Sequence, residues 1–278
     1  MNDLKKIEVE AKDIKAINSK LFNYGIVLIK GFSDKDSIMN LKEIFNDHLA
    51  MQRAGCIDIH KHPQNNGKVG RYLTNSISKD SIDLKDTFIN DFTEQIAREY
   101  YSGSKVKLCD ELFLTHELPS ETDILPWHFD RQESLKFYLN LTDVDITNGA
   151  FQYDIGSHRE GHLIANQFLM KGTSVFQIPN DVPDEFLRNP VVVDASAGDM
   201  IIFDSAGFHK AGKIDEGKER MVIRGHTHPD PMPAFKSKIF SADWFIRKFL
   251  SFTSKLFSIQ ARRASEKLFK KLSRTRDL

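Results

Sequence analysis

The feature that most constrains the fold is a series of short apolar segments in the second half of the chain, parted by Pro, Gly, Asn and Asp. Segments of this length and punctuation are typical of β-strands joined by turns. Many short strands that follow a helical start predict a β-sandwich or barrel braced by helices. The segments predicted as strands are 106–118, 134–144, 149–155, 173–178, 190–193, 199–204 and 219–227.

The first hundred residues have a different pattern. YGIVLIKGF at 24–32 is an apolar run between glycines, as in a buried strand. Residues 51–84 are rich in Asn, Gly, Ser and His and predict loops. Apolar residues at helical spacing predict helices at 4–23, at 33–49 with Ser33 or Asp34 as the N-cap, and at 85–101. The sequence therefore predicts a mainly β protein with flanking helices.

Composition narrows the class of protein. Hydrophobic residues make up 40% and charged residues 28% of the 278 residues, which is ordinary for a globular protein and excludes disorder as the main theme. Two cysteines cannot form a disulfide framework, and the start MNDLKKIEVEAKD is too charged for a signal peptide. No apolar stretch approaches the roughly 20 residues that span a bilayer. We therefore expect a cytoplasmic protein.

A candidate metal site begins in PWHFDRQESLKFYLNLTDV at 126–144. Side chains two apart on a strand point to the same face, so His128 and Asp130 can reach one ion, although such a pair is also common in solvated loops. His209 follows an apolar strand in GDMIIFDSAGFHKAG and supplies a third ligand. Two imidazoles and one carboxylate form a facial set that leaves three adjacent positions of octahedral iron(II) open.

An arginine follows eleven residues after His209, in ERMVIRGHTH. Arg220, Val222 and Arg224 share one face of a predicted strand. A buried guanidinium needs an anionic partner, and its planar fork suits a carboxylate. Arg220 alone could also lie on an exposed edge. Together with the metal set, a cosubstrate that bears a carboxylate is the better explanation.

These segments resemble one known family. The series His128-x-Asp130, NGAFQYDIGSHREGH at 148–162, AGDMIIFDSAGFHKAG at 197–212 and Arg220 resembles the phytanoyl-CoA dioxygenase family of iron(II)- and 2-oxoglutarate-dependent oxygenases. YGIVLIKGF is similar to the first core strand of that family, so the likeness runs from about residue 20 to 230. The resemblance implies a double-stranded β-helix, the cupin-like jelly roll, with the metal at its mouth and helices outside.

The resemblance also implies roles for particular residues. His128, Asp130 and His209 would bind Fe(II), and Arg220 would hold the distal carboxylate of 2-oxoglutarate. Tyr138 falls beside the cosubstrate. Lys136 shares the strand face of Tyr138, so it either meets the cosubstrate or an acidic substrate or extends to water.

Two positions depart from the family pattern. Ala211 stands where the family often has a serine that helps the arginine, which affects the detail of cosubstrate binding. Ile155 replaces the family's proline before the Gly-Ser-His turn, so that turn lacks its usual rigid residue.

The expected activity is hydroxylation of a small molecule or biosynthetic intermediate by O2, with conversion of 2-oxoglutarate to succinate and CO2. Related halogenating enzymes lack the carboxylate that Asp130 supplies here. One alternative is a cupin-like metal enzyme that does not use 2-oxoglutarate and has no need of Arg220. Another is a non-catalytic jelly-roll binding module, against which the complete ligand set argues.

The end of the chain differs in charge from the rest. Residues 240–278 carry ten Lys/Arg and three Asp/Glu, a net +7 that leaves residues 1–239 at −7. We divide the chain there into a dioxygenase domain, 1–239, and a basic amphipathic helical extension, 240–278. The apolar stripe of this helix either packs on protein, including a second subunit, or lies on anionic lipid at the inner face of a membrane. The acidic body has no basic track for nucleic acid.

Overall fold

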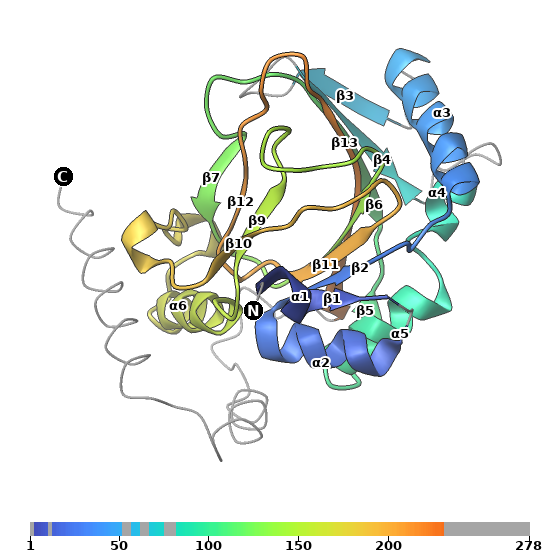
Figure 1. Ribbon diagram of the computed structural model, residues 1–278. Coiled ribbons are helices and arrows are strands. Elements are labelled where there is room, and N and C mark those ends of the chain that lie inside the picture. Colours follow the sequence, from blue (N-terminus) through green and yellow to red (C-terminus); the bar gives the residue numbers. More distant parts are fainter. Residues whose placement is uncertain (1–2, 11–12, 52–56, 62–66, 75–81, 231–278) are drawn as a thin grey trace.

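The computed structural model describes residues 3–10, 13–51, 57–61, 67–74 and 82–230. Two β-sheets face each other, and helices cover the outside of the larger one (Figure 1). The helices are α1 (Asp3–Ile7), α2 (Ile14–Tyr24), α3 (Lys35–Met51), α4 (Ile82–Asp86), α5 (Asp91–Tyr100) and α6 (His158–Met170), with 3-10 turns η3 (Val175–Gln177) and η4 (Asp184–Phe186). The strands are β1 (Glu8–Val9), β2 (Ile26–Ile29), β3 (Ile57–Lys61), β4 (Lys68–Leu73), β5 (Lys105–Lys107), β6 (Glu111–Glu117), β7 (Leu125–His128), β8 (Leu135–Asn140), β9 (Phe151–Asp154), β10 (Pro190–Val192), β11 (Met200–Asp204), β12 (His209–Ala211) and β13 (Arg220–Asp230).

The connections between strands define a jelly roll. The larger sheet has the order β1-β2-β11-β8-β13-β6-β4-β3, with β5 paired to β13, and the smaller sheet has the order β10-β9-β12-β7. From β6 to β13 the chain passes back and forth between the two sheets, and only β9 and β10 follow each other within one sheet. This is the double-stranded β-helix that the sequence predicts, with the expected flanking helices.

Strand β8 shows how alternation in the sequence positions the site. Leu135, Phe137 and Leu139 belong to the core under the helices. The residues between them have the opposite parity, and Lys136 and Tyr138 line the space between the sheets. The neighbouring strand β11 is buried on both faces, which accounts for its unbroken apolar run.

The helices begin and end where local chemistry predicts. Asp34 is the N-cap of α3, because its Oδ1 accepts from the Ser37 backbone N–H over 2.8 Å. Asp13 is the N-cap of α2, because its carboxylate accepts from the backbone N–H groups of Lys15 and Ala16, and Gly25 is the C-cap, in the left-handed region with φ 78°.

Several sequence predictions were wrong in part. The helix predicted at 4–23 is interrupted by β1, and the helix predicted at 85–101 is divided between α4 and α5. Residues 173–178 form the 3-10 turn η3 and no strand. The region 51–84, predicted as loops, contains the β3–β4 hairpin, whose polar residues alternate at the edge of the sheet. Helix α6 begins at His158, within a segment predicted as a turn. Its Gly161 lets the helix lie against the Ala206 backbone, where a Cβ would come within 1.7 Å of the carbonyl oxygen.

The predicted basic extension, residues 240–278, lies outside the described residues. Among the residues described, no helix is long and apolar enough to cross a bilayer.

Asp199 ties the first core strand to the rest of the sheet. Its side chain is buried, forms an ion pair with Lys30, and accepts from the backbone N–H groups of Gly31 and Ser196 over 2.8 Å each. These bonds join the end of β2 to the turn that starts β11, so one carboxylate fixes two adjacent strands.

We expect Asp199→Ala to lower the free energy of unfolding by roughly 2–4 kcal/mol, because it leaves two backbone donors and a half-buried ammonium without their acceptor. Urea denaturation of the metal-free protein measures this. The control Asp215→Ala removes an exposed aspartate and should stay within about 0.5 kcal/mol of the wild type. Equal midpoints for the two variants would show that the Asp199 bonds contribute little.

Candidate metal centre

Strands β7 and β12 place two histidines opposite each other. The strands are antiparallel, and His209 is the register partner of His128. Their ring centroids lie 4.3 Å apart. Asp130 follows where the chain leaves β7, and its backbone N–H donates to the Ser205 carbonyl oxygen over 2.7 Å. The pairing therefore brings together the three residues predicted as metal ligands.

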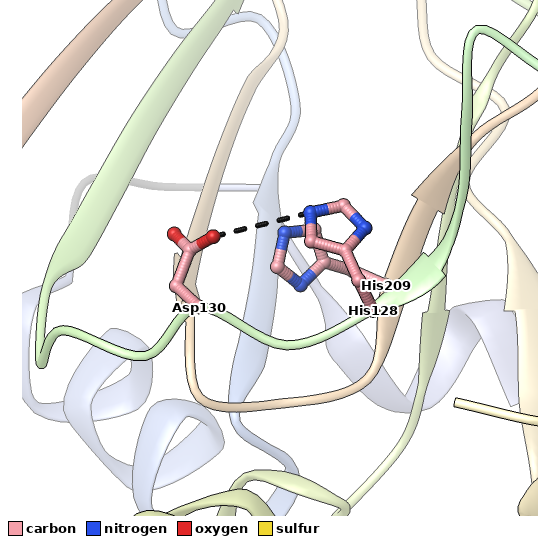
Figure 2. A group of neighbouring side chains, drawn as sticks. All are labelled: His128, Asp130 and His209. Carbon is pink, nitrogen blue, oxygen red and sulfur yellow. Dashed lines mark ion pairs between the residues drawn. The ribbon is translucent and has the colours of Figure 1, made fainter. Parts of the chain in front are cut away.

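The three side chains present a compact donor set. Each offers one ligand atom, and these atoms all lie within 4.8 Å of one another. Figure 2 shows both imidazoles on the same side of the aspartate, with a dashed line for the 3.9 Å between His128 Nε2 and Asp130 Oδ1. Two nitrogens and one oxygen at this spacing fit a single cation on one face of the set.

Hydrogen bonds fix which nitrogen of each histidine ring is available to bind a cation. Nδ1 of His128 lies 2.8 Å from the Pro126 carbonyl oxygen, and Nδ1 of His209 lies 2.7 Å from the Gly207 carbonyl oxygen. Because a carbonyl oxygen can only accept, each Nδ1 carries the proton and each Nε2 keeps its lone pair. Such backing by carbonyl groups is typical of histidines that bind metals.

The surroundings set the charge of each group. Burial lowers the pKa of His209 to about 3, with the His128 ring adding to the shift, and burial also lowers the pKa of His128. Burial opposes ionisation of Asp130, but Lys136 and the two histidines outweigh it and hold the pKa well below its usual range. At neutral pH the set is two neutral imidazoles and one carboxylate, the forms that bind a divalent cation.

All six residues predicted for the site line one pocket between the sheets. They are His128, Asp130, Lys136, Tyr138, His209 and Arg220. Sequence reasoning missed Thr115 and Glu117, which reach the same pocket from β6. Alternation in ELFLTHE puts these two side chains on one face, but nothing in the sequence says that β6 lies beside β13.

Lys136 contacts the metal set directly. Its Nζ lies 2.5 Å from Asp130 Oδ2. Burial opposes the charged form of Lys136, but the Asp130 carboxylate outweighs it and raises the pKa of the lysine. Of the two roles left open by the sequence, extension to water is therefore wrong, because this lysine points into the pocket.

Arg220 has an anionic partner within the chain. Its Nε donates to Glu117 Oε2 over 2.6 Å, its Nη2 pairs with the same carboxylate, and its Nη1 donates to the Gly149 carbonyl oxygen. Both charged side chains are buried. A guanidinium has five N–H groups, so these bonds leave two for a ligand in the pocket.

The Gly-Ser-His turn is held without the family's proline. The Ile155 N–H donates to the Asn189 carbonyl oxygen, and Gly156 takes φ 87° while its N–H donates to the Tyr24 carbonyl oxygen. Ser157 Oγ then accepts from the Phe208 backbone N–H over 2.7 Å, next to His209. Ala211 also lines the pocket, so the position of the family's serine faces the site here as a methyl group.

Comparisons with known proteins identify one family. The model of a family described as phytanoyl-CoA dioxygenase matches residues 23–222. A search of curated protein sequences gave no match.

Solved structures of similar fold are distant in sequence. One is the non-heme α-ketoglutarate-dependent epimerase SnoN of nogalamycin biosynthesis, 16% identical, with TM-score 0.56 over 78% of this chain and 82% of that one. EctD from S. alaskensis is 16% identical, with TM-score 0.57 over 80% and 79%. HygX from Streptomyces hygroscopicus, with nickel, 2-oxoglutarate and hygromycin B bound, is 14% identical, with TM-score 0.52 over 75% and 84%. At these identities the likeness shows the fold.

We expect metal affinity to fall less between pH 8 and pH 6 than it would for two ordinary imidazoles, because burial lowers the pKa of both histidines and so reduces the protons that the metal must displace. Two ordinary imidazoles would lose roughly 15-fold over this range. Co(II) titrations followed by visible absorption at pH 6, 7 and 8 measure the affinity. A loss of tenfold or more at pH 6 would contradict the expectation.

Proposed function

Because the chain belongs to the phytanoyl-CoA dioxygenase family, whose model matches residues 23–222, we propose that His128, Asp130 and His209 bind its iron(II) and that Arg220 binds its 2-oxoglutarate. Members of this family are iron- and 2-oxoglutarate-dependent oxygenases, and this chain is one of them. The observation that carries the assignment of residues is the convergence of the three donor atoms in the pocket that Arg220 also lines.

The donor set suits the metal. With Nδ1 of each imidazole bonded to a carbonyl oxygen, the two Nε2 atoms and one Asp130 oxygen are the ligands, and three positions remain for cosubstrate and O2. When bound, iron and 2-oxoglutarate supply oxidation of a substrate carbon with release of succinate and CO2. The protein holds the ligands in their neutral or anionic forms, and Phe151 and Val222 contribute apolar surface to the pocket wall.

Arg220 supports 2-oxoglutarate over a cupin-like reaction without it. The guanidinium is buried in the wall of the same pocket, and Glu117 fixes its plane through two nitrogens. Its remaining N–H groups suit the distal carboxylate of a five-carbon diacid. The Ala211 methyl group cannot donate a hydrogen bond to the distal carboxylate, so Arg220 makes this contact without the serine that the family often has. Tyr138, held edge-on against Phe203, forms the adjoining wall.

Asp130 favours hydroxylation over halogenation. Its carboxylate is present, ionised and paired with Lys136. It therefore occupies the ligand position that is without a carboxylate in the related halogenating enzymes. We propose a small molecule or biosynthetic intermediate as the substrate.

We further propose a cytoplasmic location, with residues 240–278 as a separate basic extension that contacts an anionic membrane or a second subunit. The support is the +7 net charge of this segment and its apolar stripe. The full-length chain should float with vesicles that contain phosphatidylglycerol at low salt. If the chain does not float with these vesicles, contact with a second subunit is the role that remains for this segment.

We expect anaerobic titration with Fe(II) and 2-oxoglutarate to produce the weak visible charge-transfer band of the chelate. His128→Ala should abolish it, because a ligand is lost. Arg220→Lys should keep the band but weaken 2-oxoglutarate binding by about 30-fold or more, since an ammonium replaces the fork.

The matched control is Arg98→Lys on the outer helix α5, which should bind both as the wild type does. Retained iron binding in both His128→Ala and His209→Ala would overturn the assignment of the metal ligands. Unchanged 2-oxoglutarate affinity in Arg220→Lys would overturn the role of Arg220.

A further inference from the structure

A second arginine faces the pocket. Arg224 and Thr115 both line it, from the adjacent strands β13 and β6. Arg224 Nε and Thr115 Oγ1 are buried atoms that have no hydrogen-bond partner among the described residues. A buried polar atom left unpaired costs on the order of 1–3 kcal/mol, so two of them in one pocket wall indicate a missing polar ligand.

The strand register places the two groups side by side. Thr115 is opposite Val222, and Arg224 lies two residues further along β13, so Thr115 and Arg224 are diagonal neighbours on the inner face. On the other side, the guanidinium carbon of Arg224 lies 5.7 Å from the centroid of the Tyr138 ring. Cation–π contact of this kind holds the guanidinium in place while leaving its N–H groups available.

The charges in the pocket are unequal. Of the residues that the structure describes, four cations line it, and three of these have a carboxylate partner: Lys136 has Asp130, Lys210 has Asp123, and Arg220 has Glu117. Within the described part of the chain, Arg224 has no ion pair with a carboxylate. A half-buried guanidinium without a counter-ion favours an anion from outside the protein.

One molecule of 2-oxoglutarate does not satisfy both arginines. In the proposed function its keto acid end binds iron and its single distal carboxylate binds Arg220. Four residues along a strand separate the Cα atoms of Arg220 and Arg224 by about 13 Å. A second anionic group is therefore needed, and the molecule that must supply it is the substrate.

We propose that Arg224 and Thr115 form a subsite for an anionic group, a carboxylate or a phosphate, of the molecule that is oxidised. The inference rests on the proposed function, and it assigns the substrate class as acidic. Arg224 donates from its fork, and the Thr115 hydroxyl donates a further hydrogen bond to the same oxyanion. Bound there, the substrate extends from β13 toward the iron ligands on β7 and β12.

The test titrates inorganic phosphate and acetate, separately, into the anaerobic complex with Fe(II) and saturating 2-oxoglutarate, with calorimetry as the readout. The wild type should bind one or both at millimolar concentration. Arg224→Met should weaken this binding about tenfold or more, and Thr115→Val by a smaller factor. Both variants should keep the affinity for 2-oxoglutarate within about twofold of the wild type. Tighter binding of phosphate indicates a phosphorylated substrate, and tighter binding of acetate indicates a carboxylic acid.

The control Arg98→Met removes an exposed arginine and should leave anion binding unchanged. Arg224→Lys keeps the charge and should restore part of the affinity, which separates the subsite from a general loss of structure. The proposal is overturned if Arg224→Met leaves phosphate and acetate binding unchanged, if the wild type binds neither, or if Arg224→Met weakens 2-oxoglutarate instead. Phosphate titration of the metal-free protein tests the subsite even where iron and 2-oxoglutarate fail to bind.

Discussion

The antiparallel pairing of β7 with β12 is the constraint on which the site depends. His209 is the register partner of His128, and a slip of one residue would turn one imidazole away from the other. Bonds on both sides hold this register: β12 also pairs with β9, and the Ser157 hydroxyl accepts from the backbone just before His209. The metal set is thus a product of sheet geometry, because His209 is far along the chain from His128 and Asp130 and only the strand pairing brings it to them.

The same geometry controls charge. Burial keeps both imidazoles neutral, and each is backed by a carbonyl oxygen that fixes its tautomer. Asp130 stays ionised at similar depth because the Lys136 ammonium is beside it. Removing either member of a buried ion pair leaves the other charge without its partner, which destabilises the fold. Lys136 therefore has two effects, because its ammonium also keeps Asp130 in the ionised form that binds a cation.

How much of this could be predicted from the sequence depended on how local the signal was. The shared parity of Lys136 and Tyr138, and of Arg220 and Arg224, is a property of single strands, and the structure confirms it, because both members of each pair line the pocket. Helix α6 was missed because Gly161 is a poor helix former. The glycine is needed there because the helix packs against the backbone of Ala206, which is distant in the sequence. Glu117 was missed because its pairing with Arg220 depends on which strands are neighbours, which no local pattern encodes.

The two sheets contribute different chemistry to the pocket. The smaller sheet and the chain that leaves it provide the metal ligands, whereas the larger sheet provides the cations Lys136, Arg220 and Arg224. Glu117 offsets the charge of Arg220, and that pairing orients the fork before any ligand arrives. In the part of the chain that the structure describes, the Arg224 guanidinium is held by the Tyr138 ring and by no carboxylate, so its charge remains available. A change on β13 can therefore alter which anion is bound without moving the iron ligands, because no backbone bond joins β13 to β7 or β12.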